Sequence, residues 1–267
     1  MELTVNGSKT YIYTGTHALE PGRTTWLFVH GAGMDHSAWI LQSRYFAFHG
    51  QNVMAVDLPG HGRSAGEPLG SIEAQADWLA ALLDAASVEQ AMVVGHSMGS
   101  LAAVDFAARY RDRVKGLALV GTGFPMPVAE PLLEATRAND PRGIGMIMNW
   151  GISPQSHLGG NQAPGLWIHG QGVRLLEQAA PGVLFTDMNA CNAYEAGVAR
   201  AGEIACPVHF VIGDRDMMTP PKATAALADA VTAPVSRTVL RGCGHMTPLE
   251  RPNELLDELI AFGARLG

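Results

Sequence analysis

Short apolar runs alternate with longer amphipathic stretches along the first 121 residues. The runs are four to six residues long and apolar on both faces, which is typical of strands in a parallel sheet covered by helices. The stretches between them have the spacing of helices that bury one face. The expected strands are 25–30, 53–56, 91–95 and 115–120, and the expected helices are 37–48, 71–86 and 101–110.

The same alternation resumes after residue 204, and a hairpin of edge strands is expected before residue 15. An Asn-Gly pair at 6–7 favours a tight turn in that hairpin. These elements are the strands 2–6, 10–14, 208–213 and 235–240 and the helices 220–231 and 253–266. The sequence therefore predicts an α/β protein with a mostly parallel eight-stranded sheet and helices on both faces.

Residues 122–203 interrupt this alternation and predict an inserted helical cap. The segment has few strand-like runs, and no Asp, Glu, Lys or Arg occurs from Gly143 to Val173. A buried connector is one interpretation; we favour a helical lid whose uncharged inner surface faces an apolar ligand. The core would then comprise residues 1–121 and 204–267. Helices are expected near 128–138, 141–150, 170–179 and 188–201.

Composition narrows the classes of function. The net charge of −7, without a basic run, disfavours nucleic acid and anionic membranes as partners. No apolar run is long enough to span a membrane, and the first residues lack the pattern of a signal peptide. Three widely spaced cysteines suit free thiols in a reducing compartment. We therefore expect a cytoplasmic protein, and the sequence leaves open whether it is a homodimer.

The segment Gly95-His96-Ser97-Met98-Gly99 fits the G-x-S-x-G pattern. The pattern alone is weak, because a glycine-bounded turn produces it by chance. Here it lies between an expected strand and an expected helix, which is the context that a nucleophilic serine requires. The helix behind Ser97 would also direct its N-terminal N–H groups toward the site.

A serine hydroxyl needs an adjacent base, and the base needs a third group to orient it. His245 follows the last expected strand, and Asp216 follows the preceding one. A lone histidine or aspartate in a loop is usually a surface or turn residue. The order Ser97, Asp216, His245, with all three at the C-terminal ends of strands, nevertheless predicts a nucleophile, an acid and a base.

With these motifs, the sequence resembles the α/β-hydrolase superfamily over essentially its whole length. The matching segments are His30–Gly33, Asp57–Ser64, Gly95–Gly99, Gly213–Asp216 and Gly244-His245. The resemblance implies that the acid is Asp216, three residues after Gly213, while Asp214 caps the turn. It also implies an oxyanion hole formed by the backbone N–H groups of Met98 and Ala32, with Ala32 favoured over Gly33. His30 would brace this loop.

Methionine and tryptophan residues near these motifs are candidates for substrate contact, because methionine adapts to irregular apolar ligands. About half of the methionines are expected to be ordinary core residues. The candidates are Met34, Trp150, Trp167, Met217 and Met246. The cap has no basic cluster, which disfavours a phosphorylated or CoA-sized ligand. No metal or nucleotide motif occurs, so no cofactor and no metal are expected.

The favoured function is a cofactor-free serine hydrolase that cleaves an ester or related acyl bond of a small apolar substrate through an acyl-enzyme. One alternative is a carbon–carbon bond hydrolase of ring-cleavage diketones, with which Trp39 is compatible. Members of that branch usually carry Asn before the serine, where this chain has His96. A non-catalytic small-molecule receptor on the same fold is the other alternative.

Overall fold

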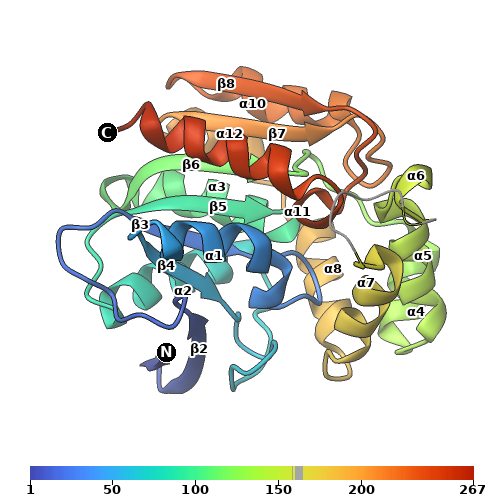
Figure 1. Cartoon of the computed structure of the whole chain (residues 1–267). Coiled ribbons are helices and arrows are strands. Elements are labelled where there is room, and N and C mark those ends of the chain that lie inside the picture. Colours follow the sequence, from blue (N-terminus) through green and yellow to red (C-terminus); the bar gives the residue numbers. More distant parts are fainter. Residues whose placement is uncertain (158, 160–164) are drawn as a thin grey trace.

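An eight-stranded sheet runs through the molecule in the order β1-β2-β4-β3-β5-β6-β7-β8 (Figure 1). The computed structural model describes residues 1–157, 159 and 165–267. Strand β2 is antiparallel to both of its neighbours, and all other pairs are parallel. The strands are β1 (Glu2–Val5), β2 (Ser8–Tyr13), β3 (Thr25–Val29), β4 (Asn52–Val56), β5 (Ala91–His96), β6 (Val114–Val120), β7 (Val208–Gly213) and β8 (Val235–Leu240). The predicted mostly parallel α/β sheet is confirmed.

Helices cover both faces of the sheet. Figure 1 shows α1 and α12 on one face and α2, α3 and α10 on the other. The core helices are η1 (His36–Trp39), α1 (Ile40–Phe48), α2 (Ile72–Ala85), α3 (Met98–Arg109), η2 (Arg111–Arg113), η3 (Pro221–Thr224), α10 (Ala225–Ala230), α11 (Thr247–Glu250) and α12 (Pro252–Ala264). Among the described residues, no helix combines the length and the apolar character needed to cross a membrane.

Local sequence explains where these elements begin. Every residue of β3, β4, β5 and β7 is buried, which accounts for their continuous apolar runs. The β1–β2 hairpin turns through Asn6 and Gly7, at φ of 48° and 80°, the left-handed conformation that a tight hairpin turn requires. Helix α2 begins after Ser71, whose side chain accepts a hydrogen bond from the N–H of Ala74.

The insertion between β6 and β7, residues 122–203, is called the cap below. Its helices α4 to α8 lie beyond the C-terminal ends of the strands (Figure 1). The helices of the whole insertion are α4 (Glu130–Arg137), α5 (Pro141–Gly151), α6 (Pro154–His157), α7 (Ile168–Glu177), α8 (Val183–Ala193) and α9 (Gly197–Glu203). Part of the uncharged stretch, residues 158 and 160–164, lies outside the described residues.

The prediction of one helix over 188–201 is wrong, because α8 and α9 are separate helices. Tyr194 lies between them with an extended backbone, at ψ 120°. Its hydroxyl donates a hydrogen bond to Asp105 of α3 at 2.9 Å, and α9 packs against α3 and α10. The chain therefore turns at Tyr194 to return from the cap to the core. The short helix α6 was not anticipated.

Candidate active site

The C-terminal ends of four parallel strands bring the sequence motifs to one edge of the sheet. The loop with Gly31 and Ala32 follows β3, Ser97 follows β5, Asp216 follows β7 and His245 follows β8. Ser97, His245 and Ala32 line the same cavity, of about 150 Å³. Asp216 lies behind His245, within hydrogen-bonding distance of its ring. Segments more than 100 residues apart in sequence thus meet at one cavity.

Ser97 occupies a strained turn between β5 and α3. Its backbone has φ 52° and ψ −120°, a conformation that residues other than glycine rarely adopt. The turn is tight, because a Cβ at Gly99 would lie 2.5 Å from the carbonyl oxygens of Val29 and His30. The N–H of Ser97 donates to the carbonyl of Val120 at 3.1 Å. These contacts fix the serine at the cavity and explain the glycine of the motif at position 99.

Asp216 and His245 form a buried pair. The Nδ1–H of His245 donates to Oδ2 of Asp216 at 2.8 Å. The same carboxylate accepts the backbone N–H groups of Met218 and Thr219 and the Thr219 hydroxyl, at 2.9, 2.7 and 2.7 Å. Burial acts to raise the pKa of Asp216, but the His245 charge and these hydrogen bonds outweigh it and hold the pKa below its ordinary value. Asp216 is therefore a carboxylate at neutral pH.

The backbone of His245 is held from two sides. His96 donates its Nε2–H to the His245 carbonyl at 2.8 Å, and burial, followed by the nearby His245 charge, lowers the pKa of His96 to about 3. On the other side, the N–H groups of His245 and Met246 both donate to the carbonyl of Gly151, at 2.8 and 3.0 Å. Gly151 is the last residue of cap helix α5, so the cap supports the histidine loop directly.

Two acidic residues brace this loop further. Glu250 is fully buried, and its carboxylate accepts the N–H groups of Gly244 and Ser153 at 3.1 and 3.0 Å. Glu250 has no signature in the sequence, because a single acid in a short C-terminal helix belongs to no motif. Asp214 accepts the N–H of Gly242 at 2.6 Å, while its contact with Arg215 is 3.9 Å long. Asp214 therefore connects the acid turn to the histidine loop.

The two expected oxyanion donors come from the loop after β3 and from the start of α3. Ala32 lines the cavity, and Met98 is the first residue of α3, where backbone N–H groups have no acceptor within the helix. The Met98 side chain is fully buried, with its sulfur 3.3 Å from the amide nitrogen of Gln75. The N–H of Gly33 donates to Asp187 of the cap at 2.8 Å. Gly33 is thus engaged elsewhere, which leaves Ala32 as the candidate donor from this loop.

His30 braces the same loop, as the sequence suggested. Its Nδ1–H donates to the carbonyl of Gly31 at 2.8 Å, and its Nε2 accepts the N–H of Leu58 at 3.2 Å. Burial, followed by the charge of His61, lowers the pKa of His30 to about 4. These two contacts require a neutral ring, with one nitrogen that donates and one that accepts.

Only some of the expected substrate residues reach the cavity. Trp150 and Met217 line it. Met34 and Met246 do not, because both are buried between α7 and the histidine loop, against a separate small apolar cavity. Trp167 is 64% exposed and stacks on His169 with the ring centroids 6.1 Å apart, so it also lies away from the cavity.

Other apolar side chains complete the cavity wall. Most come from the start of the cap and from α8. The sequence alone does not distinguish the methionines of the cavity wall from those of the core. They are Met126, Pro127, Val128, Ala129, Leu132, Met188, Cys191 and Met218. No Lys or Arg is among the described residues that line the cavity. Burial raises the pKa of the Cys191 thiol, and it raises that of Cys243, beside His245, to about 12. Both thiols are thus protonated at neutral pH.

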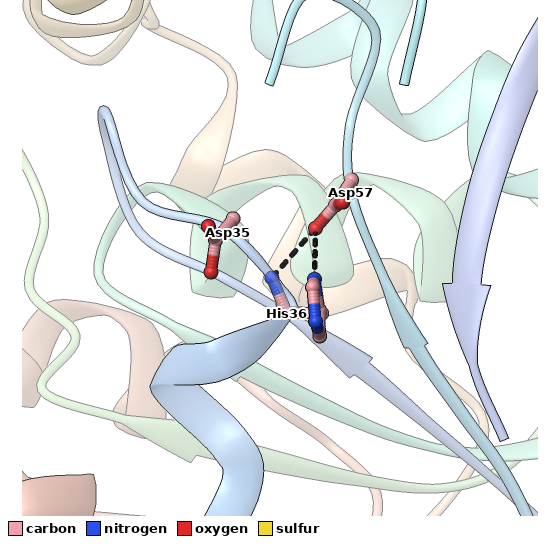
Figure 2. A group of neighbouring side chains, drawn as sticks. All are labelled: Asp35, His36 and Asp57. Atoms are coloured by element: carbon pink, nitrogen blue, oxygen red, sulfur yellow. Dashed lines mark hydrogen bonds and ion pairs between the residues drawn. The ribbon is translucent and has the colours of Figure 1, made fainter. Parts of the chain in front are cut away.

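Asp35, His36 and Asp57 form a cluster beside the loop after β3 (Figure 2). Hydrogen bonds already occupy it: Oδ1 of Asp57 accepts the backbone N–H and the ring Nδ1–H of His36, both at 2.7 Å. Its Oδ2 accepts the N–H of Arg63 at 2.9 Å, and Asp35 accepts the N–H of Ser37 at 2.8 Å. We therefore assign the cluster a structural role in joining the loops after β3 and β4.

The comparison with protein families agrees with this architecture. A model of the alpha/beta hydrolase family matches residues 26–258. The chain belongs to this family. The pimeloyl-[acyl-carrier protein] methyl ester esterase of Chromobacterium violaceum is 34% identical over 196 residues, which cover 67% of this chain and 71% of that protein. Family and relative together support hydrolysis as the class of reaction.

Two further proteins are similar to this chain. The dihydrolipoyllysine-residue acetyltransferase component of an acetoin cleaving system from Cupriavidus necator is 41% identical over 100 residues, covering 37% of this chain. The match spans only 26% of that relative. The enol-lactonase from Burkholderia xenovorans has a TM-score of 0.85 at 20% identity and covers 99% of this chain and 100% of its own. This last likeness shows the fold.

Proposed function

We propose that this hydrolase is a serine esterase that cleaves an ester or related acyl bond of a small apolar substrate through an acyl-enzyme. The observation that carries the proposal is the shared cavity: Ser97 and His245 line it together, and Asp216 holds the histidine from behind. The name of one similar protein, a methyl ester esterase, favours an acyl bond as the bond cleaved.

In the proposed mechanism, Asp216 fixes the proton of His245 on Nδ1, which leaves Nε2 to accept the hydroxyl proton of Ser97. The serine oxygen attacks the carbonyl carbon, and the developing oxyanion accepts N–H groups from Ala32 and Met98. His245 then donates its proton to the leaving alcohol. Water repeats the sequence on the acyl-enzyme, releasing the carboxylic acid and restoring Ser97.

The cavity indicates the size and character of the acyl group. Its volume of about 150 Å³ is that of an apolar protein cavity known to hold benzene. Four methionines (Met126, Met188, Met217 and Met218) contribute to its wall, and they can adapt to different apolar groups. Without a cationic side chain on the described wall, a polyanionic acyl carrier gains no charge pairing inside it. We therefore infer an uncharged acyl group of roughly six carbons or fewer.

The carbon–carbon hydrolase alternative has less support. Trp39, the residue compatible with it, is fully buried against Phe28, with ring centroids 5.3 Å apart, and it does not line the cavity. Its ring edge faces His96 at 6.3 Å. Trp39 thus packs the core beneath the site and has no route to a substrate ring.

A p-nitrophenyl ester series from acetate to octanoate, with Ser97→Ala as control, tests the proposal. We expect turnover to rise with chain length, pass a maximum near six carbons and fall at octanoate, and to vanish in Ser97→Ala. Turnover that survives in Ser97→Ala contradicts the assignment of the nucleophile. If the folded wild-type protein hydrolyses none of the esters, a ring-cleavage diketone is tested next. Cleavage of the diketone favours the carbon–carbon hydrolase, and binding without cleavage favours the receptor.

A further inference from the structure

Asp187, on cap helix α8, reaches out of the cap and contacts two loops of the core. It is fully buried, and its Oδ2 accepts the backbone N–H of Gly33 and the Nε2–H of His61, both at 2.8 Å. Gly33 and His61 lie 154 and 126 residues away in sequence. A single carboxylate oxygen therefore joins the cap to the loop after β3 and to the loop after β4.

The partner of Asp187 is a charged histidine. The Nδ1 of His61 lies 2.9 Å from the carbonyl oxygen of Pro59, and its Nε2 faces the carboxylate. Since both ring nitrogens face acceptors, the ring satisfies both contacts only when it is doubly protonated. Burial acts to lower the pKa of His61, but the charge and hydrogen bond of Asp187, together with the Pro59 carbonyl and the charge of Asp57, outweigh it and raise the pKa.

The groups around this pair fit an ion pair. The ring of His30 lies 4.9 Å from that of His61, and its pKa of about 4 leaves it uncharged. Asp57 is the other carboxylate that acts on His61. The second oxygen of Asp187 has no hydrogen-bond partner within the described part of the chain. Within the described residues, the buried carboxylate therefore accepts hydrogen bonds from Gly33 and His61 alone.

The cap also packs directly onto Gly33. This residue has φ 67°, and a Cβ there would lie 2.8 Å from a methyl carbon of Leu184 on α8 and 3.1 Å from one of Leu176 on α7. The loop is thus enclosed between the cap and the core. The N–H of Gly33 is directed into Asp187, while Ala32, the residue before it, lines the cavity.

We propose that Asp187 and His61 are positioning residues of the oxyanion hole, which act by anchoring the N–H of Gly33 and so directing the N–H of Ala32 toward the substrate. This inference rests on the proposed serine-esterase function. The cap then contributes to the chemistry as well as to substrate selection: a residue that never touches the substrate sets one of the two oxyanion donors.

The variants Asp187→Ala and Asp187→Asn test this role. Alanine removes both contacts, whereas asparagine retains an oxygen that can accept from Gly33 but removes the charge. We expect Asp187→Ala to lower kcat about 30-fold with KM changed less than threefold, because loss of one oxyanion donor lowers kcat by about 10²–10³-fold and the loop is displaced rather than deleted. Asp187→Asn should recover most of this loss.

Asp105→Asn is the matched control. Asp105 is also a fully buried carboxylate, and it joins core to cap through the Tyr194 hydroxyl at 2.9 Å. It also pairs with Arg109 of its own helix at 2.6 Å, and neither partner belongs to the oxyanion loop. It should lower the melting temperature without changing kcat. If kcat of Asp187→Ala equals that of the wild type, or if Asp105→Asn lowers kcat as much as Asp187→Ala does, the positioning role is wrong.

A second readout does not depend on turnover. In an NMR titration of the histidine rings, the pKa of His61 should fall in Asp187→Asn, because burial is no longer opposed by the carboxylate, and stay unchanged in Asp105→Asn. An unchanged His61 pKa in Asp187→Asn overturns the ion pair.

Labelling of Ser97 by a fluorophosphonate separates failure of the proposed function from failure of the positioning role. A wild-type protein that is not labelled and hydrolyses no ester overturns the proposed function and the oxyanion role with it. Labelling and turnover that are equal in wild type and both Asp187 variants overturn only the positioning role.

Discussion

The carbonyl oxygen of Gly151, at the end of cap helix α5, accepts the backbone N–H of His245 at 2.8 Å. The buried Glu250 strengthens this junction by accepting one N–H from the histidine loop and one from Ser153 of the cap. The proposed general base is therefore held between the sheet and the insertion.

Removing the Glu250 carboxylate should destabilise the protein and disturb the histidine loop. Glu250→Ala leaves the N–H groups of Gly244 and Ser153 buried without an acceptor, which costs about 1–3 kcal/mol for each group. We expect the free energy of unfolding in urea to fall by about 2–4 kcal/mol. Glu250→Gln retains an acceptor oxygen and should lose less than half of that; equal losses in the two variants contradict the assignment.

The two carboxylates of the acid turn should differ sharply in their effect on catalysis. Asp216→Asn should lower kcat by about 10⁴-fold, as the same substitution does in a Ser-His-Asp triad, because the histidine loses the partner that fixes its tautomer. Asp214→Asn keeps an oxygen for the N–H of Gly242 and should lower kcat by less than about tenfold. Esterase assays on the two purified variants decide between the carboxylates, and the reverse ranking would make Asp214 the acid.

The Thr219 hydroxyl should support Asp216. Thr219→Val keeps the shape of the side chain but removes the 2.7 Å hydrogen bond to Oδ2, and a hydrogen bond to a charged group is worth about 1.5–3 kcal/mol. We expect kcat to fall about tenfold with KM unchanged. Thr224→Val removes a buried hydrogen bond to the Thr122 carbonyl instead, so it should lower stability and leave kcat as it is.

The Asp57 carboxylate should stabilise the protein in a pH-dependent way. Burial acts to raise its pKa, but hydrogen bonds from His36 and Arg63 outweigh it, so the pKa in the folded protein lies below the ordinary value of 3.8. This stabilisation is fully present above pH 3.8 and is lost as the pH falls through the lowered pKa. Asp57→Asn should therefore be less stable than the wild type by about 2 kcal/mol at pH 7, and the difference should shrink below pH 4. A difference that grows toward acid pH has the wrong sign.

Enlarging the cavity should move the preference toward longer acyl chains. Met126→Ala shortens a side chain of the cavity wall, and one methylene in an apolar pocket is worth about 1–3 kcal/mol of discrimination. The ratio of kcat/KM for the octanoate and butanoate esters should rise about tenfold or more. Met148→Ala truncates a fully buried methionine that does not line the cavity, so it should lower stability without changing the ratio.

The sequence predicted the sheet well because local patterns decide it. The buried runs around Leu27 and Val93 are apolar. The turn at Ser97 also has a local signature, because a Cβ at Gly95 would overlap the backbone of Gly99 and Ser100 in the helix that follows. The break between α8 and α9 could not be predicted from the sequence, because it depends on the contact of Tyr194 with Asp105, which is 89 residues away.

The same limit applies to the site. Met34 and Met126 look alike in the sequence, and only the course of the cap places one in the core and the other on the cavity wall. The contact between Asp187 and Gly33 has no local signature either, because neither residue belongs to a motif that names the other. The candidate triad residues lie in sequence motifs, whereas the residues that hold them in place come together through long-range packing.

The carbonyl of Gly151 also limits how such an enzyme can change its specificity. An insertion exchanged as a block would have to supply a new acceptor for the N–H of His245, at the same position relative to β8, before the protein could work at all. Substitutions within the existing cap, at side chains such as Leu132, leave that backbone acceptor untouched. New substrate preferences should therefore arise one side chain at a time, while the path of the chain through residue 151 is retained.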